Sequence, residues 1–156
     1  MSTHVARTRS GDTTPATDYD TDFYAWAVEQ AKRIREGAFE TLDRENVAEE
    51  IESLGREQFS KLRSAYRVLL MHMLKWDHQP EKRTRSWSTT IVNQRLDLED
   101  VLADSPSLKN RIDEAVAKAY RRARIEAAQE TELPLSTFPE TNPYSLDDVM
   151  ERAFDL

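Results

Sequence analysis

The chain has 156 residues, no cysteine, and 22 basic against 29 acidic side chains, which gives a net charge of −7. Without cysteine it can form no disulfide, no thiolate metal site and no cysteine nucleophile. The acidic total disfavours nonspecific binding to nucleic acid or membranes, although a local basic patch is compatible with it.

The composition predicts helices in a single domain. Only 3 residues are glycine, whereas the strong helix formers Ala, Glu, Arg and Leu are abundant and no alternating strand pattern stands out. A chain of this length can bury roughly 68–70% of its unfolded surface in one domain. Residues 1–18 are rich in Thr, Ser and Asp and are expected to form a disordered tail, which leaves residues 19–156 as one helical domain.

Apolar runs are short. No segment reaches the ~18–20 uninterrupted apolar residues of a membrane span, and the N-terminal residues lack the apolar centre of a secretory signal. We therefore expect a cytoplasmic protein with no membrane contact.

The first two helices are delimited by their caps. Thr21 or Asp22 can cap the first, which ends at Gly37. Its predicted inward face comprises Phe23, Tyr24, Ala27, Gln30, Ala31 and Ile34, with Trp26 at the edge. Asp43 is the expected cap of a long second helix over 44–77, with Gly55 as a site of bending, of close approach by a neighbour, or of a break into two helices. The predicted buried stripe of the second helix comprises Val47, Ile51, Leu54, Leu62, Ala65, Tyr66, Leu69, Met73 and Trp76.

Pro80 must stop the second helix near His78. A third helix is expected from a cap at Ser86 to about Asp104, and a fourth from Ser105-Pro106 to about Glu130. A proline-rich arm, LPLSTFPETNPY, follows, and Ser145 with Asp148 forms a capping-box pattern for a last short helix. The fold class is therefore all-α: an antiparallel bundle of four main helices, an extended arm and a short C-terminal helix.

Polar side chains within the apolar stripes are the first candidate site. They are Gln30, Gln58, His72, Gln94 and Arg95. Buried amide and imidazole groups need hydrogen-bond partners, so these residues either pair with one another and fix the helix register or line a pocket between helices. The register alternative is the more common role of single buried polar groups in bundles.

Metal and nucleophilic sites have little support in the sequence. His72 and His78 diverge by 240° on one helix, and neither HExxH nor a Glu-x-x-His pair is present. The three glycines are isolated, so no phosphate-binding loop is formed. No metal, no cofactor and no conventional catalytic site are therefore expected.

The loop after the second helix is the second candidate site, a contact surface formed by His78, Lys82, Arg83 and Arg85. With Trp76 and Trp87 nearby, this loop could bind single-stranded nucleic acid, but both Trp fall on the inward stripes and the cations can pair with surplus carboxylates. A second basic cluster on the fourth helix comprises Lys118, Arg121, Arg122 and Arg124.

Several motifs occur in order: NVAEEIESLG, LLMHMLKW, QP and SW in the loop, SPSL, AAQETELP and FPETNPY. Over Tyr19 to Leu156 the chain resembles the bacterial family catalogued as domain of unknown function family 29. The resemblance implies an all-helical bacterial protein and no particular activity. Relatives often have glycine in ETGLP and cysteine in CPY, where this chain has Glu132 and Asn142.

Together these patterns favour a cytoplasmic helical binding or adaptor module, with a protein partner or a homodimer formed through an exposed helix face. One alternative is a small-ligand site or weak hydrolase around His72. The other is nucleic-acid contact through the loop 78–87.

Overall fold

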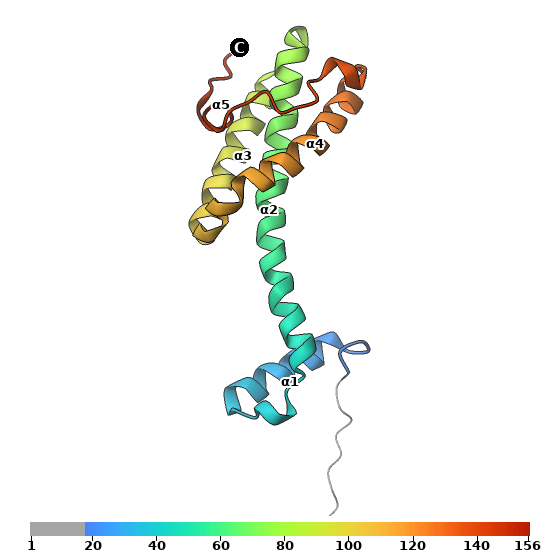
Figure 1. Ribbon diagram of the computed structural model, residues 1–156, viewed down its shortest axis with the longest axis vertical. Helices are drawn as coiled ribbons and strands as arrows, with labels where there is room; N and C mark the ends of the chain where they lie inside the picture. Colours follow the sequence, from blue (N-terminus) through green and yellow to red (C-terminus); the bar gives the residue numbers. More distant parts are fainter. Residues whose placement is uncertain (1–17) are drawn as a thin grey trace, which may run out of the picture. The chain divides into compact units, whose positions relative to one another are not determined.

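The computed structural model describes residues 18–156, so the tail predicted for residues 1–18 lies almost wholly outside the described residues. All regular structure within this range is helical, which confirms the all-α class with four main helices (Figure 1). The chain divides into two compact units, one that ends at Glu52 and one that runs from Ser53 to Leu156. A single domain over 19–156 stays a prediction.

Helix α1, Phe23–Glu36, has the predicted caps. The Asp22 carboxylate accepts a hydrogen bond from the backbone N–H of Ala25 at 3.0 Å, which satisfies one of the unpaired donors of the first turn. Gly37 closes the helix with φ of 72°, a left-handed conformation that glycine adopts without steric cost. Both ends of the helix are therefore determined by local sequence.

The face of α1 that is buried differs from the prediction. Trp26 and Gln30 are buried, whereas Phe23 is 50% and Tyr24 is 80% exposed. The reason is Asp43: its carboxylate accepts a hydrogen bond from the Trp26 indole at 3.0 Å, and its backbone N–H donates to the Gln30 amide oxygen at 2.9 Å. These two bonds hold Trp26 and Gln30 inward, whereas Phe23, Tyr24 and Ile34 of the predicted face are exposed.

A short 3₁₀ turn, η1 (Phe39–Thr41), leads to α2, Arg44–His78. Asp43 is its cap, as predicted, and accepts from the backbone N–H of Asn46 at 3.4 Å. The helix continues through Gly55, where a Cβ would have no atom within 4 Å. The predicted alternatives of a break or of a closely approaching neighbour at this glycine are therefore wrong.

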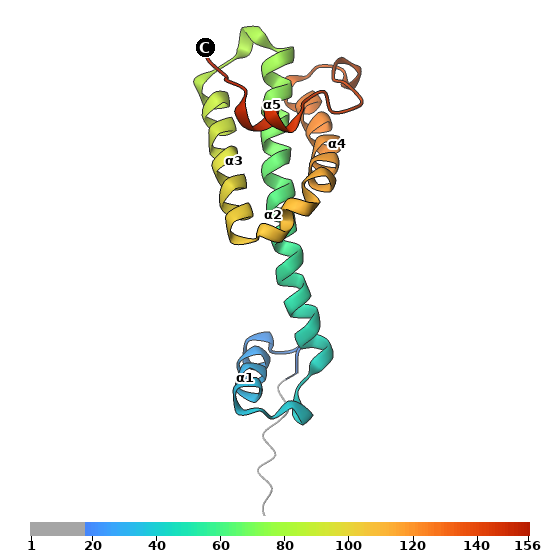
Figure 2. The ribbon, with the colours of Figure 1, turned by 60° about the vertical axis from the view of Figure 1, so that its left-hand side comes forward.

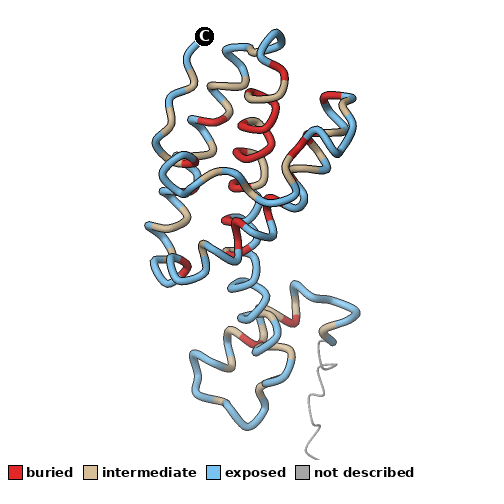
Figure 3. Tube along the Cα trace, turned by 45° about the horizontal axis from the view of Figure 1, so that its top comes forward, coloured by how far each residue is buried: buried red, intermediate tan, exposed pale blue. Residues whose placement is uncertain are grey.

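Burial along α2 begins at Phe59 and continues to Trp76 (Figure 3). The predicted stripe is correct from Leu62 onward, but Ile51 is 63% and Leu54 is 62% exposed. Within the second unit, the partner helices cover α2 only over its C-terminal half, so the same apolar periodicity is core in one half of the helix and surface in the other.

Helix α3 spans Arg85–Asp104 and follows a 3₁₀ turn, η2 (Pro80–Lys82). Its cap is Thr84, which accepts from the backbone N–H of Trp87 at 3.4 Å, so the prediction of Ser86 is wrong. Thr84 has extended backbone angles typical of a cap, whereas Ser86 is already inside the helix. The basic loop is therefore two residues shorter than expected.

The fourth helical segment starts as a 3₁₀ helix, η3 (Pro106–Arg111), and becomes α4 at Ile112–Thr131. In the second unit, α3 runs antiparallel to α2, and α3 and α4 lie on either side of it (Figure 2). The core between these helices includes Leu69, Met73, Leu98 and Ala123, each fully buried. Small residues on α4 occur at every fourth position, at Ala115, Ala119, Ala123 and Ala127, and they allow close packing.

The C-terminal arm, residues 132–156, contains η4 (Leu135–Thr137) and α5 (Leu146–Glu151) and crosses the face of the second unit (Figure 2). The predicted capping box is confirmed: Ser145 accepts from the backbone N–H of Asp148 at 3.0 Å, and Asp148 accepts from that of Ser145 at 2.9 Å. Phe138 and Val149 insert into the core and anchor the arm.

Candidate functional site

The five polar residues of the first candidate site have different surroundings. Gln30 in the first unit is bonded to the backbone of Asp43. On α3, the Gln94 amide donates to the Asp97 carboxylate at 3.1 Å. Gln58 on α2 is half-buried. A network or pocket that joins the five stays a prediction, since the hydrogen bonds described here connect these residues to other groups.

His72 is half-buried on α2, and its Nδ1 lies 2.8 Å from the carbonyl oxygen of Val68 one turn earlier. A carbonyl only accepts, so Nδ1 carries the proton. Burial lowers the pKa of the His72 imidazole, and the bond to Val68 partly offsets that effect. The Nδ1 of His72 is therefore bonded within its own helix. The ring lines neither of the two grooves described below.

Arg95 fastens the arm to α3. Its Nε donates to the carbonyl oxygen of Val149 at 2.8 Å, and its Nη2 donates to that of Arg152 at 2.8 Å. It also borders a shallow groove of about 420 Å³ between α3 and the end of the arm. Arg95 thus points inward because its guanidinium group binds the carbonyl oxygens of the arm, which is a structural role.

In the loop after α2, two of the four candidate side chains have internal contacts. Arg83 donates to the carbonyl oxygen of Trp76 at 2.9 Å and lies 5.0 Å from the centre of its ring. His78 packs edge-to-face on Phe138 of the arm, with ring centres 4.9 Å apart. Lys82 and Arg85 are exposed. The loop as a contact surface stays a prediction that rests on those last two cations.

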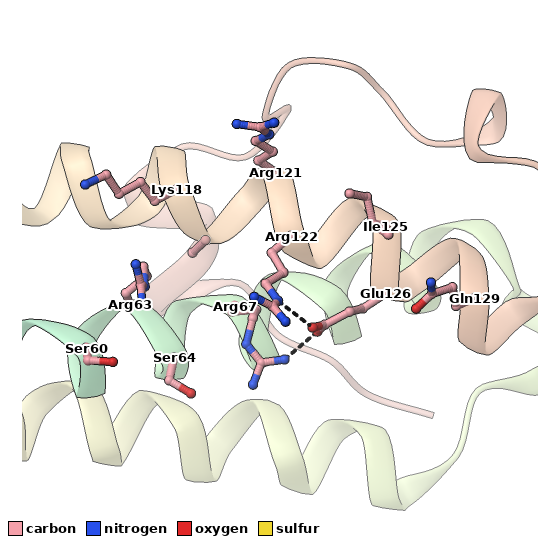
Figure 4. Close-up of a pocket in the computed structure, with 11 residues that line it drawn as sticks. Ser60, Arg63, Ser64, Arg67, Lys118, Arg121, Arg122, Ile125, Glu126 and Gln129 are labelled. Carbon is pink, nitrogen blue, oxygen red and sulfur yellow. Dashed lines mark hydrogen bonds and ion pairs between the residues drawn. The ribbon is translucent and has the colours of Figure 1, made fainter. Parts of the chain in front are cut away.

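Several positive charges gather on a different surface of the second unit. Between α2 and α4, the second unit has a groove of about 760 Å³ (Figure 4), called the basic groove below. Five cationic side chains and one carboxylate line it. Its lining residues are Ser60, Arg63, Ser64, Arg67, Lys118, Ala119, Arg121, Arg122, Ile125, Glu126 and Gln129. This surplus of positive charge is local, because the whole chain carries −7.

Glu126 is the only carboxylate of the basic groove and is shared by two arginines (Figure 4). Arg67 from α2 forms an ion pair with it, and Arg122 on α4 lies 3.3 Å from it. Lys118 pairs outside the groove with Glu114 at 2.8 Å. Arg63 and Arg121 form no ion pair within residues 18–156, so two guanidinium groups can bind an external anion without first breaking a contact.

The predicted basic cluster on the fourth helix contributes three of these cations but not Arg124. Arg124 instead donates to the carbonyl oxygens of Phe138 at 3.0 Å and Leu135 at 3.2 Å and holds the arm. Sequence reasoning missed Arg63 and Arg67, which lie on the outward face of α2. Their spacing of four residues on a polar helix face was the available signal.

The arm is tied to α2 by one further ionic cluster. The Asp77 carboxylate accepts from the Tyr144 hydroxyl at 2.8 Å and from Arg152 at 2.6 and 2.9 Å. Burial raises the pKa of Asp77, but the bonds from Arg152 and Tyr144 outweigh burial and lower the pKa overall. Burial and the bond to Asp77 both raise the pKa of Tyr144. These groups are all partnered, so we assign the cluster a structural role.

Within residues 18–156 there is no group of three or more His, Cys, Asp or Glu residues placed to hold a metal ion. Of the helices described, none combines the length and apolarity that a membrane crossing requires.

Residues 19–155 match the model of DUF29, described as a domain of unknown function. The chain belongs to this family. The match confirms the resemblance inferred from the motifs between the first helix and the arm. No curated protein and no solved structure matches the chain.

The backbone conformation of Glu132 has an energetic consequence. Glu132 ends α4 with φ of 57° and is the one non-glycine residue with positive φ in the described part of the chain. A left-handed conformation costs a residue with a side chain roughly 1–2 kcal/mol. The end of α4 at Glu132 is therefore strained, and a glycine at this position would relieve the strain.

Proposed function

We propose that the chain is a cytoplasmic bacterial binding module, and that it holds an anionic surface of a partner protein in the basic groove. The observation that carries the proposal is the presence of Arg63 and Arg121 without ion-pair partners in a chain of net charge −7. Two arginines left unpaired in one groove favour a role in binding.

The lining of the basic groove indicates the chemistry of its ligand. Arginine presents a planar fork of N–H donors that fits carboxylate and phosphate oxygens. Ser60, Ser64 and Gln129 add neutral hydrogen-bonding groups, and Ala119 and Ile125 add apolar surface. No aromatic side chain is among the lining residues, so the groove lacks the stacking platforms typical of single-strand nucleic-acid sites. A protein surface rich in carboxylates fits this lining best.

Binding can be tested with a fluorescent acidic peptide and fluorescence anisotropy at low and high salt. Arg63→Glu and Arg121→Glu are expected to weaken binding, and added salt should weaken it further because exposed charges are screened. Lys82→Glu, an equal change of charge in the loop, is the matched control and should have little effect. If Lys82→Glu abolishes binding and the groove variants do not, the loop is the site and the proposal is wrong.

Glu126→Gln provides a test in the opposite direction. It removes the carboxylate that neutralises Arg67 and Arg122, so the affinity for the acidic peptide should rise. Unit charges 4 Å apart interact by about 1 kcal/mol in water, so the expected gain is about threefold to fivefold. A single-stranded oligonucleotide and a DNA duplex belong in the same titration, and tighter binding of either than of the peptide would favour a nucleic-acid partner instead.

A further inference from the structure

We propose that the anionic partner is a second copy of this chain, and that helix α3 of each copy lies on the basic groove of the other. The proposal rests on the proposed function and specifies the partner. All the residues that form the contact belong to one compact unit, Ser53–Leu156.

Helix α3 has a row of exposed carboxylates, called the acidic row below. It consists of Asp97, Asp100 and Asp104, which fall within an arc of about 60° at 100° per residue. Asp97 accepts one hydrogen bond from Gln94, whereas the side chains of Asp100 and Asp104 form no hydrogen bond or ion pair within residues 18–156. These last two carboxylates can therefore bind an external cation without first losing a contact.

The acidic row and the basic groove lie on the same side of the second unit, the side away from the arm. On α3, Arg95 donates to carbonyl oxygens of the arm, and Asp104 is about 180° around the helix from it. On α4, Arg124 donates to the arm, and the groove residue Arg122 is about 160° around the helix from it. One surface therefore carries both sets of charge.

The two sets are also level with each other along the helices. Helix α2 lies between α3 and α4 and is antiparallel to α3 (Figure 2). The Lys75 ammonium lies 4.5 Å from the centre of the Trp87 ring, which aligns α2 with α3. Arg63 lies 12 residues before Lys75, and Asp100 lies 13 residues after Trp87. Because each residue adds about 1.5 Å to a helix, Arg63 and Asp100 are nearly level.

The direction of the two-fold axis decides which charges meet when two copies pack through this side. An axis parallel to α2 exchanges the two strips and keeps their level, so Arg63 of one copy meets Asp100 of the other. An axis across the helices would instead place one basic groove on the other. The favourable contact is isologous, so each copy contributes one groove and one acidic row.

The size of the paired surface predicts a weak dimer. Three helices packed 8–10 Å apart form a face roughly 25 Å wide. The groove residues of α4 run from Lys118 to Gln129, which is about 17 Å of helix. The area is therefore on the order of 450 Å² per copy, at the low end of specific interfaces. We expect a micromolar dissociation constant that rises as salt is added.

Charge reversal tests the proposal by analytical ultracentrifugation of the full chain at micromolar to millimolar concentrations. The wild type should dimerise at low salt and dissociate as salt is added. Asp100→Lys with Asp104→Lys makes both strips basic, and Arg63→Glu with Arg121→Glu makes both strips acidic. Each double variant should therefore dimerise at least about tenfold more weakly than the wild type.

A control variant carries the same change of charge on the side that faces the arm. Glu99 is exposed and lies about 40° from Arg95 around α3, and Glu140 is exposed in the arm. Glu99→Lys with Glu140→Lys should leave the dimer unchanged. If it weakens the dimer as much as Asp100→Lys with Asp104→Lys, net charge controls association and the proposal is wrong.

Mixing the two charge-reversed variants is the decisive measurement. Each strip of one variant then meets a strip of opposite charge on the other, so an equimolar mixture should form a heterodimer although neither variant dimerises alone. A misfolded variant could not restore association, so a heterodimer also shows that both variants fold. Absence of a heterodimer, with both variants folded by circular dichroism, would overturn the proposal.

Crosslinking tests the direction of the axis. Ser64 lines the basic groove on α2, on the edge nearer α3 (Figure 4), so an axis parallel to α2 passes close to it. Because the chain has no cysteine, Ser64→Cys introduces a single reactive thiol, and a short bismaleimide should link two copies. Ser136→Cys, at an exposed position of the arm, should link far less. Equal crosslinking at both positions would refute the arrangement.

The failure of this inference is distinguishable from that of the proposed function. A wild-type monomer at all concentrations and salts, together with peptide binding that Arg63→Glu abolishes, would reject the second copy as partner and retain the basic groove. A dimer that is unaffected by Arg63→Glu with Arg121→Glu would reject the groove as its interface.

Discussion

Replacing Asp77 with asparagine would measure how strongly the arm is tied to α2. The carboxylate accepts hydrogen bonds from Tyr144 and from two nitrogens of Arg152. Asparagine has nearly the same size, but it removes the negative charge and one of the two acceptor oxygens. The change therefore weakens the Asp77 contacts without leaving a cavity.

The expected loss of stability follows from the number of these hydrogen bonds and from the exposure of the side chains that form them. Hydrogen bonds to charged groups contribute about 1.5–3 kcal/mol each. The side chains of Asp77 and Arg152 are 26% and 34% exposed, and solvent screening reduces the value of partly exposed ion pairs. We expect a loss of about 2 kcal/mol in the free energy of unfolding, which corresponds to a fall of about 4–8 °C in the melting temperature for a chain of this size.

The effect of Asp77→Asn on the free energy of unfolding should depend on pH. The pKa of Asp77 is lower in the folded chain than the value of about 3.9 in an unfolded chain. The stabilisation by the carboxylate is therefore complete well above that value and is lost as the pH falls through the folded pKa. The difference between wild type and variant should be full at neutral pH and should shrink in strongly acidic solution.

Urea unfolding followed by circular dichroism, at neutral pH and at a series of acidic values, is the appropriate assay. Asp97→Asn is a matched control, because Asp97 is exposed and accepts one hydrogen bond from Gln94. A loss at neutral pH no larger than the ~0.5 kcal/mol typical of surface substitutions, or a difference that persists unchanged in acid, would refute the reasoning.

Three further substitutions test individual positions by the same unfolding assay. Glu132→Gly should stabilise the chain by about 0.5–1 kcal/mol, because it relieves the left-handed strain and only part of that gain is lost to the greater freedom of glycine when unfolded; destabilisation would mean that φ at this position is not positive. Gly55→Ala should stabilise by about 1 kcal/mol, since a Cβ there meets no atom within 4 Å and alanine favours helix; no gain would indicate that α2 is not helical there. Ala123→Leu should destabilise by about 1–3 kcal/mol, because the fully buried alanine has no room for extra methylene groups; an unchanged midpoint would mean that α4 is loosely packed.

Helix ends were predictable from the sequence because caps depend on a few neighbouring residues. Asp22, Gly37 and Asp43 act as predicted, and so does the capping box at Ser145. The error at Ser86 has the same local origin, since Thr84 two residues earlier is an equally good cap. Local chemistry therefore identifies candidate caps, but it does not decide between two good candidates two residues apart.

The buried face of α1 could not be predicted from periodicity. The predicted inward arc included Gln30 and placed Trp26 only at its edge, and hydrogen bonds of both residues with Asp43, which lies beyond α1, bury these two side chains. The same limitation applies to Ile51 and Leu54, whose spacing is identical to that of core residues. Periodicity reports which residues share a face, and long-range contacts determine whether that face is covered.

Only the α4 side of the basic groove could be predicted from the sequence. The cations of α4 are close together in the chain, but Arg63 and Arg67 join them from a helix about 55 residues earlier. Arg124 looked like a member of the cluster and instead holds the arm. A site formed by two helices requires their pairing and rotation to be known, and one sequence supplies neither directly.

The way in which the arm is fastened has a consequence for sequence divergence. Tyr120, Arg95 and Arg124 all reach carbonyl oxygens of the arm, and a carbonyl is present whatever the side chain. Exposed arm positions such as Ser136 and Thr141 should therefore tolerate almost any amino acid. Deleting one residue would displace every later carbonyl from its donor, so we expect the arm to vary in composition at its exposed positions and to keep a constant length.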